Sequence, residues 1–196
     1  MDLVFVRHAR PVRHDAVEGR ADPGLSGEGR AEAERLGRWL AADRVDHLYA
    51  SPARRAIETA GPLAERAGLE CAVHEGLGEF DREATSYVPI EDLASTDERW
   101  LALARGEFYT DVDPVAFRNR VVAAVEEIIG KHPGEVVVAV CHGGVINGYV
   151  GHILGIPTSL WFSPRYASIS RVAASRRGHR SVVSLNETGH LRHEPW

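Results

Sequence analysis

The segment that most constrains the fold is residues 136–140, which read Val-Val-Val-Ala-Val. A short continuous run of valines is typical of a strand that is buried on both faces of a sheet. The run leads into Cys141-His142-Gly143-Gly144 and then into a helical pattern that extends to about Leu154. A strand covered on both faces needs helices on both sides, so this segment predicts an α/β sandwich.

Strands and helices alternate along the rest of the chain. Further strands are predicted at residues 3–6, 45–50, 70–74, 166–173 and 181–185. Helices are predicted from a Ser26 cap, from Ser51-Pro52 to Gly68, from Ile90 to Arg105, and from Asp113-Pro114 onward. The alternation predicts a three-layer sandwich, with a mainly parallel six-stranded sheet and helices on both faces. We expect a single domain over residues 1–196, with an excursion from the sheet at about 80–112.

Composition and charge argue against several classes of protein. The formal net charge is −5 and there is no long basic run, which argues against a nucleic-acid partner. Residues 176–180 hold the densest basic stretch, and we expect them to form a solvated turn. The apolar run at the N-terminus is too short for a signal peptide, and no segment is long enough to span a bilayer. Cys71 and Cys141 are expected to be buried free thiols, which favours a cytoplasmic location.

Polar residues follow several of the predicted strands at the point where each strand ends. Arg7-His8 follows the first strand, residues 51–55 follow the second, and His142-Gly143 follows the valine run. Glu79 lies beyond the third strand. In open α/β sheets, ligands bind at the carboxyl ends of the strands. The sequence therefore predicts a site that gathers two histidines, two arginines and a carboxylate at one end of the sheet.

Five segments resemble the histidine phosphatase superfamily, branch 1, the phosphoglycerate mutase-like group. They match its Arg-His-Gly, Asp-x-x-Leu-Thr/Ser-x-x-Gly, Ser-Ser-x-x-x-Arg-Ala-x-Gln-Thr-Ala, Leu-x-Glu and Val-Ser-His-Gly-Gly motifs. Each motif is weak alone, but five in order over nearly the whole chain form a specific signal. The matching segments are Arg7-His8-Ala9-Arg10, Asp22-Pro-Gly-Leu-Ser-Gly-Glu-Gly29, Ala50-Ser-Pro-Ala-Arg-Arg-Ala-Ile-Glu-Thr-Ala60, Leu77-Gly-Glu79-Phe80 and Val140-Cys-His-Gly-Gly-Val145.

Three positions depart from the family pattern. Ala9 replaces the usual glycine, and Glu58 replaces a common glutamine. His14 stands where many members carry an asparagine that contacts phosphate. The changes at Ala9 and His14 affect the expected substrate contacts and leave the other motif residues intact.

The resemblance implies a phosphomonoesterase that forms a phosphohistidine on His8, acts on a small phosphorylated metabolite and needs neither cofactor nor metal. Arg7, Arg55 and a protonated His142 would stabilise the phosphoryl charge, with backbone amides at the glycine pair. Glu79 would act as the general acid and then as the base, for which burial should raise its pKa. The implied substrate-binding set is Arg7, His14, Arg55, His142 and Gly143.

Several assignments stay open on residue types alone. Helix position does not separate Arg54 from Arg55, and only the resemblance favours Arg55. Near Glu79, the alternative proton donors are Glu75, Asp81 and Glu83. Tyr87, Trp100 and Tyr109 fit either the mouth of the site or the core of the excursion. Cys141 continues the valine run and is expected to be inert, and His190 and His193 are expected to be exposed tail residues.

Other functions compete with a phosphatase. A cofactor-dependent phosphoglycerate mutase would return the phosphate to another hydroxyl, although the short excursion favours hydrolysis. A non-catalytic phospho-ligand binder on the same scaffold would normally lack the nucleophile or the acid. A zinc hydrolase is a more distant alternative, since no helix carries histidines at i and i+4. The expected partner is a small-molecule phosphate ester. Neither a nucleic acid nor a membrane is expected as a partner, and homo-oligomerisation is left open.

Overall fold

The structure is a computed structural model that describes residues 1–192. Its main sheet contains β1 (Asp2–Arg7), β3 (His47–Ala50), β4 (Cys71–Val73), β6 (Val136–Cys141), β7 (Ile169–Ala174) and β8 (Arg180–Glu187). Its α-helices are α1 (Gly27–Leu40), α2 (Arg54–Ala67), α3 (Glu98–Ala104), α4 (Pro114–Lys131) and α5 (Gly143–Leu154). A second, two-stranded sheet pairs β2 (His14–Asp15) with β5 (Ser86–Tyr87). Short 3₁₀ turns lie at Glu75–Leu77, Ile90–Asp92 and Gly189–Leu191.

The main sheet has six strands in the order β4-β3-β6-β1-β7-β8. The pairs β3–β4, β3–β6 and β1–β6 are parallel, whereas β1–β7 and β7–β8 are antiparallel. The predicted mainly parallel sheet is confirmed. The valine run is its central strand, β6, which lies between β3 and β1.

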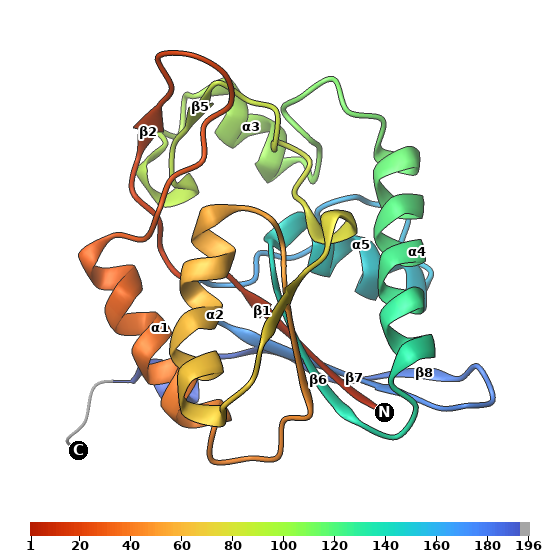
Figure 1. Cartoon of the computed structure of the whole chain (residues 1–196). Helices are drawn as coiled ribbons and strands as arrows, with labels where there is room; N and C mark the ends of the chain where they lie inside the picture. Colours follow the sequence, from red (N-terminus) through yellow and green to blue (C-terminus); the bar gives the residue numbers. More distant parts are fainter. Residues whose placement is uncertain (193–196) are drawn as a thin grey trace.

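Alternate residues of the strands pack against different helix pairs, which makes the three layers (Figure 1). Leu3 and Phe5 of β1 belong to the core that α4 and α5 complete. Val4 and Val6 belong to the core that α1 and α2 complete. Because successive side chains of a strand point to opposite faces, this division accounts for a strand that is apolar at every position. The segment with β2, β5 and α3 lies beyond one end of the sheet (Figure 1).

Local sequence signals place most helix ends. The Ser26 side chain accepts a hydrogen bond from the Gly29 amide at 3.0 Å and caps α1 as expected. Asp113 accepts from the Val115 amide at 2.8 Å, and Pro114 occupies the first helical position of α4. Gly68 ends α2 in a left-handed conformation with φ of 64°, which glycine adopts without a steric penalty.

Two helix predictions are wrong in their bounds. The helix expected from Ser51-Pro52 begins at Arg54, with Ala53 as its N-cap; the buried Ser51 hydroxyl contacts His142 and accepts from the Ala53 amide at 3.3 Å, ahead of the first helical residue. The single helix expected over residues 90–105 is broken into the 3₁₀ turn and α3. The Asp97 carboxylate accepts from the Arg99 amide at 2.9 Å and so starts a new helix there.

Two burial predictions are also wrong. Cys71 is only half-buried, because it lies on the edge strand β4. His190 is buried, and its Nε2 donates to the Ala167 carbonyl oxygen at 2.9 Å. His193 lies outside the described residues. Residues 176–179 form the expected turn between β7 and β8, and Arg180 is the first residue of β8.

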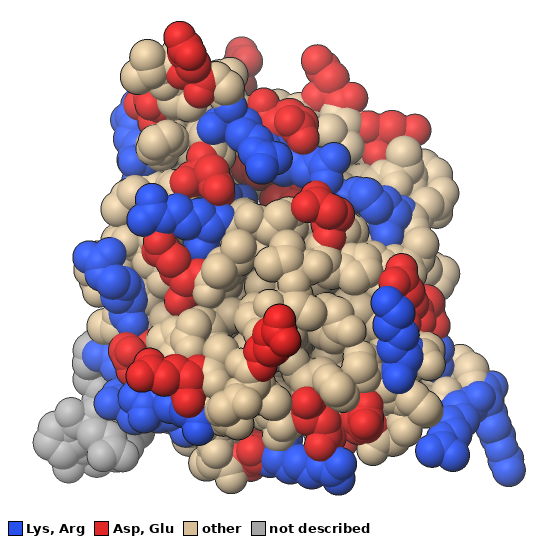
Figure 2. Space-filling model, in the orientation of Figure 1, with Lys and Arg blue, Asp and Glu red and all other residues tan. Residues whose placement is uncertain are grey.

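The surface of the described residues fits the charge balance of the sequence. Figure 2 shows basic and acidic side chains interspersed on the visible face, with no broad field of one sign. Among residues 1–192, no helix is long and apolar enough to cross a membrane.

Candidate active site

Three parallel strands end beside one another and deliver the predicted residues to one edge of the sheet. In the register of β1, β6 and β3, Arg7 lies opposite Cys141, and Val140 lies opposite Ala50. The His8 amide donates to the Cys141 carbonyl oxygen at 2.9 Å, which continues the ladder by one step. The ladder therefore sets the positions of His8, Ser51 and His142 directly, and the His8 and His142 rings lie 5.1 Å apart between centroids.

The local hydrogen bonds of His8 select one tautomer of its ring. Nδ1 lies 2.9 Å from the carbonyl oxygen of Ala9. Since a carbonyl oxygen only accepts, Nδ1 must carry the proton and Nε2 keeps its lone pair. Nε2 faces the Nε of Arg55 at 3.3 Å, within the buried interior of the site. The arrangement holds a free imidazole nitrogen beside a fixed cation.

The electrostatic surroundings of both site histidines disfavour their protonated forms. Burial lowers the pKa of His8 well below its usual value, and the charges of Arg55 and Arg7 lower it further. Burial followed by Arg55 and His8 lowers the pKa of His142 in the same way. The expected protonated form of His142 belongs to the reaction with a phosphate ester, and it stays a prediction, since the cations around the buried ring oppose protonation here.

The two arginines are held rigidly beneath the site. Arg7 donates from Nη1 to the Pro164 carbonyl oxygen at 2.6 Å and stacks over the Tyr166 ring at 3.8 Å. Arg55 stacks over the Tyr87 ring at 4.6 Å, and only 4% of its side chain is exposed. Arg54, the alternative, is exposed and donates to Glu58 at 2.6 Å. The structure therefore brings Arg55, and not Arg54, to His8.

Glu79 is buried against the first turn of α5. Its Oε2 accepts from the Gly144 amide at 2.9 Å, and its Oε1 accepts from the Phe80 amide at 3.1 Å. Burial raises its pKa to about 7, with a further contribution from the negative charge of Asp81. The rise outweighs the opposing effect of the two amides, so near pH 7 Glu79 can give or take a proton.

The other carboxylates near Glu79 are separated by their exposure. Glu75 and Glu83 have 78% and 72% of their side chains exposed, which places them in solvent. Asp81 has 7% of its side chain exposed, and its Oδ2 accepts from the Tyr109 hydroxyl at 2.6 Å. Its Oδ1 lies 3.7 Å from Nη2 of Arg55. Of the three alternative proton donors, Asp81 is therefore the one that lies in the site beside Glu79.

The glycine pair after His142 has different roles at its two positions. A Cβ added at Gly144 would lie 2.2 Å from the Glu79 Oε1 atom, whereas one at Gly143 would lie 3.8 Å from Pro164. Gly144 is thus required for the close approach of Glu79 to α5. Of the two glycine amides expected to stabilise the phosphoryl charge, that of Gly144 donates to Glu79.

We expect Gly144→Ala to displace the Glu79 carboxylate and, for the phosphomonoesterase that the family resemblance implies, to lower turnover of an alkyl phosphate about a hundredfold, since a misplacement of about 1 Å has that effect. Gly148→Ala is the matched control, because a Cβ there meets only ordinary contacts at 3.7 Å on the same helix. Measured kcat/KM should fall in the first variant and stay unchanged in the second. Equal activity in both would show that the position of Glu79 is not critical.

A cavity of about 390 Å³ opens above these groups. The two histidines, Arg7, Arg55 and Glu79 line its floor, and Asp81, Arg99 and a larger number of apolar side chains line the rest. Tyr87, Trp100 and Tyr109 all line it, as the first of the two alternatives for them expects, and Tyr109 also packs against Phe80 of the core. The remaining apolar wall comes from Val88, Ile90, Leu93, Leu103, Leu160, Trp161, Phe162 and Pro164.

Two residues of the site were not singled out for it from the sequence. The Ser51 hydroxyl lies 2.7 Å from His142 Nε2 and orients that ring. Asn147 donates to the carbonyl oxygens of Gly143 and Phe162 and accepts from the Trp161 amide, so it fixes residues 161–162 against α5. Of these two residues, only Ser51 carried a sequence signal, because it directly follows a predicted strand.

His14 is the predicted site residue that the structure does not bring to the cavity. It is exposed on β2, where its backbone pairs with Tyr87 of β5. Tyr87 lines the cavity and His14 does not. The structure therefore does not place His14 for the expected phosphate contact. Its strand pairs with the strand of Tyr87, which lines the cavity, and its own side chain lies outside.

Comparison with known proteins identifies the family and the fold. Residues 3–188 match the family model of the histidine phosphatase superfamily, branch 1. The chain is 29% identical over 199 residues to phosphoserine phosphatase 1 of Hydrogenobacter thermophilus, with 96% of this chain and 93% of that protein covered. The structure of Bacillus stearothermophilus YhfR is similar with a TM-score of 0.76, 25% identity and coverage of 97% and 99%.

A third similar protein is phosphoserine phosphatase of Entamoeba histolytica, solved in complex with 3-phosphoglyceric acid. It has a TM-score of 0.77 and 21% identity, and it covers 97% of this chain and 99% of that one. At this identity the likeness concerns the fold. Together with the YhfR comparison, it confirms the predicted phosphoglycerate mutase-like α/β architecture.

Proposed function

The chain belongs to branch 1 of the histidine phosphatase superfamily, and from this premise we propose that it is a phosphomonoesterase that acts through a phosphohistidine on His8. The observation that carries the proposal is the state of the His8 ring. Ala9 holds the proton on Nδ1, and Nε2 faces the cavity floor beside Arg55. A neutral, oriented imidazole among fixed cations has the properties of a phosphoryl acceptor.

In the first step, Nε2 of His8 attacks phosphorus and the bond to the ester oxygen breaks. Arg7 and Arg55 stabilise the charge that spreads over the phosphoryl oxygens. Protonated Glu79 gives its proton to the departing alkoxide, so the alcohol leaves neutral. The bound phosphate dianion favours the protonated form of His142, which then adds a further donor.

In the second step, water attacks phosphorus and the nitrogen–phosphorus bond breaks. Glu79, now ionised, takes the proton of the water, and inorganic phosphate leaves. His8 regains its free Nε2 and Glu79 its proton, so the cycle closes. The charge is balanced by residues of the chain throughout, and no step requires a metal ion.

For the substrate we propose a small phosphate ester. The cavity volume is within the range of pockets that enclose metabolite-sized ligands. Support also comes from relatives that act on such esters, phosphoserine phosphatase 1 among them. The apolar wall would contact the alcohol portion, and the cationic floor would hold the phosphate.

A panel of phosphomonoesters tests the proposal, with inorganic phosphate measured in the presence of EDTA. We expect phosphate release from at least one small ester and full activity with the chelator. Activity that disappears in EDTA and returns with magnesium or zinc would contradict metal independence. Phosphate that moves to a second hydroxyl without release would indicate a mutase, and no turnover with tight phosphate binding would indicate a binding protein.

The pH dependence follows from the two shifted pKa values. Glu79 must be protonated for the first step, so kcat/KM on an alkyl phosphate should fall as pH rises above about 7. His8 must be neutral, and its lowered pKa keeps it so throughout the neutral range. The loss of activity at low pH that protonation of His8 causes should therefore occur well below the ordinary pKa of a histidine. A pH–rate profile that rises through pH 8 would contradict the assignment of Glu79 as the acid.

A further inference from the structure

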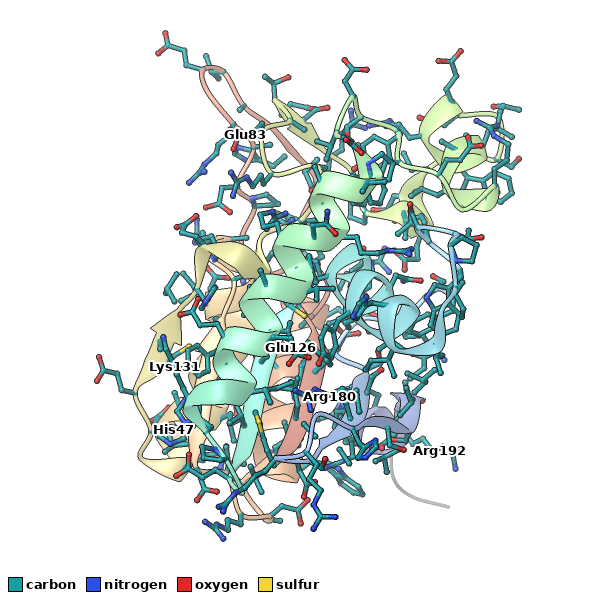
Figure 3. The ribbon with its side chains drawn as sticks, turned by 90° about the vertical axis from the view of Figure 1, so that its right-hand side faces the viewer. His47, Glu83, Glu126, Lys131, Arg180 and Arg192 are labelled. Atoms are coloured by element: carbon teal, nitrogen blue, oxygen red, sulfur yellow. The ribbon has the colours of Figure 1, made fainter. Side chains whose placement is uncertain are left out.

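Three metal-binding side chains meet at the end of the sheet opposite the candidate active site. His47 begins β3, while His132 and Glu135 flank the turn between α4 and β6. At about 3.3 Å per strand residue, the four steps from His47 to Ser51 span about 13 Å. Figure 3 shows His47 below Lys131, at the far end of the molecule from Glu83. This cluster plays no part in the proposed phosphatase chemistry.

The donor atoms of the cluster converge on one point. Oε2 of Glu135 lies 3.1 Å from Nε2 of His47 and 2.9 Å from Nδ1 of His132. All three donor atoms lie within 4.8 Å of one another, and the centroids of the two rings lie 3.9 Å apart with the ring planes tilted by 36°. In a tetrahedral zinc site with bonds of about 2.0–2.1 Å, ligand atoms lie about 3.3 Å apart. The two nitrogen–oxygen distances are already close to that spacing.

The backbone holds these residues in place without a metal. His132-Pro133-Gly134-Glu135 forms a tight turn in which the Glu135 amide donates to the His132 carbonyl oxygen at 3.3 Å. Gly134 has φ of 90°, a conformation that favours glycine. The neighbouring Asp46 exchanges two hydrogen bonds with Val136, its amide donating at 2.9 Å and its carboxylate accepting at 2.8 Å. The strand that carries His47 is thus tied to the turn that carries the other two ligands.

A partner for the second ring nitrogen of His132 is also present. The Tyr49 hydroxyl lies 2.8 Å from Nε2 of His132. If a metal ion takes Nδ1, Nε2 carries the proton and donates to the Tyr49 oxygen. Metal-bound histidines commonly make such an outer hydrogen bond, which fixes the ring and its tautomer.

From these contacts we infer that His47, His132 and Glu135 form a structural binding site for a divalent transition metal ion, with zinc as the best match. Two imidazoles and one carboxylate suit zinc, whereas magnesium and calcium prefer oxygen ligands alone. His47 and Glu135 have 42% and 38% of their side chains exposed, which leaves an entry path and room for water as a fourth ligand. A bound ion would join β3, α4 and β6 and stabilise the native state.

Calorimetric titration of the metal-free full chain with zinc chloride tests this inference. We expect one saturable site that is lost in His47→Gln and in Glu135→Gln. Tyr49→Phe should weaken binding about tenfold to a hundredfold, as loss of an outer partner does. His179→Gln is the control, because this histidine lies in the exposed turn between β7 and β8. His8→Ala should bind zinc as the wild type does, which separates the site from the histidines of the cavity.

Thermal unfolding provides a second readout. Zinc should raise the unfolding temperature of the wild type and of His179→Gln, and it should leave that of His47→Gln unchanged. Phosphate release by His47→Gln without zinc should equal that of the wild type, which confirms that this variant folds. Zinc binding that survives in both His47→Gln and Glu135→Gln, or the absence of saturable binding to the wild type, would overturn the inference.

Discussion

Replacing His8 by alanine should abolish phosphate release, with a loss of at least about ten-thousandfold in kcat, as expected when a covalent nucleophile is removed. Within the described residues, the ring supplies the free Nε2 that faces Arg55 over the cavity floor. In the neighbouring His142, Nε2 is engaged with Ser51 at 2.7 Å, and Nδ1 has no hydrogen-bond partner among residues 1–192. The measurement is phosphate release from the best substrate of the ester panel.

The same variant should still bind inorganic phosphate, because Arg7 and Arg55 remain. Its fold should persist, since the backbone of residue 8 keeps its ladder bond to Cys141. In the wild type, labelled phosphate should be trapped on the protein in alkali, where phosphohistidine survives, and none should be trapped on His8→Ala. Turnover of His8→Ala within tenfold of the wild type would refute the phosphohistidine mechanism.

Much of this site could be predicted from the sequence because strand ends carry it. Apolar runs locate β1, β3 and β6, and the parallel arrangement then brings the residues that follow them together. His8 and His142 each lie one residue beyond the end of a strand. Their position therefore depends on backbone register, which hydrophobic patterning determines well.

The parts that could not be predicted depend on long side chains and on loops. Arg54 and Arg55 are adjacent in sequence and residue type does not separate them; the family resemblance favoured Arg55, which is the one that α2 buries. His14 lies on a two-residue strand whose pairing with β5 sends it to the surface, and no periodicity signals so short an element. The zinc ligands His47, His132 and Glu135 come from separate segments and match no sequential metal motif.

The second large effect is expected for Glu79→Gln, and its size should depend on the leaving group. Loss of a general acid commonly costs about a hundredfold to ten-thousandfold. The cost should be high for an alkyl phosphate, whose alkoxide needs a proton in order to leave. It should be much smaller for p-nitrophenyl phosphate, because nitrophenolate leaves without one. The comparison of kcat/KM for both esters in wild type and variant gives the measurement.

Asp81→Asn is the matched control, because Asp81 is the other buried carboxylate of the cavity. The negative charge of Asp81 contributes to the raised pKa of Glu79, so its removal should lower that pKa and move the alkaline limb to lower pH. At a pH where Glu79 is protonated, Asp81→Asn should leave the ratio of the kcat/KM values for the two esters unchanged. A leaving-group effect in Asp81→Asn and not in Glu79→Gln would make Asp81 the acid.

Glu79→Gln should also change the fate of the phosphoenzyme. Glutamine cannot take the proton of the attacking water, so hydrolysis of phosphohistidine should slow. With p-nitrophenyl phosphate, formation of the intermediate is nearly unaffected while its breakdown is retarded, and labelled phosphoenzyme should accumulate. Alkaline trapping should therefore recover more label from Glu79→Gln than from the wild type. Equal losses on both esters, without trapped label, would show that Glu79 only supports the first turn of α5 through the Gly144 amide.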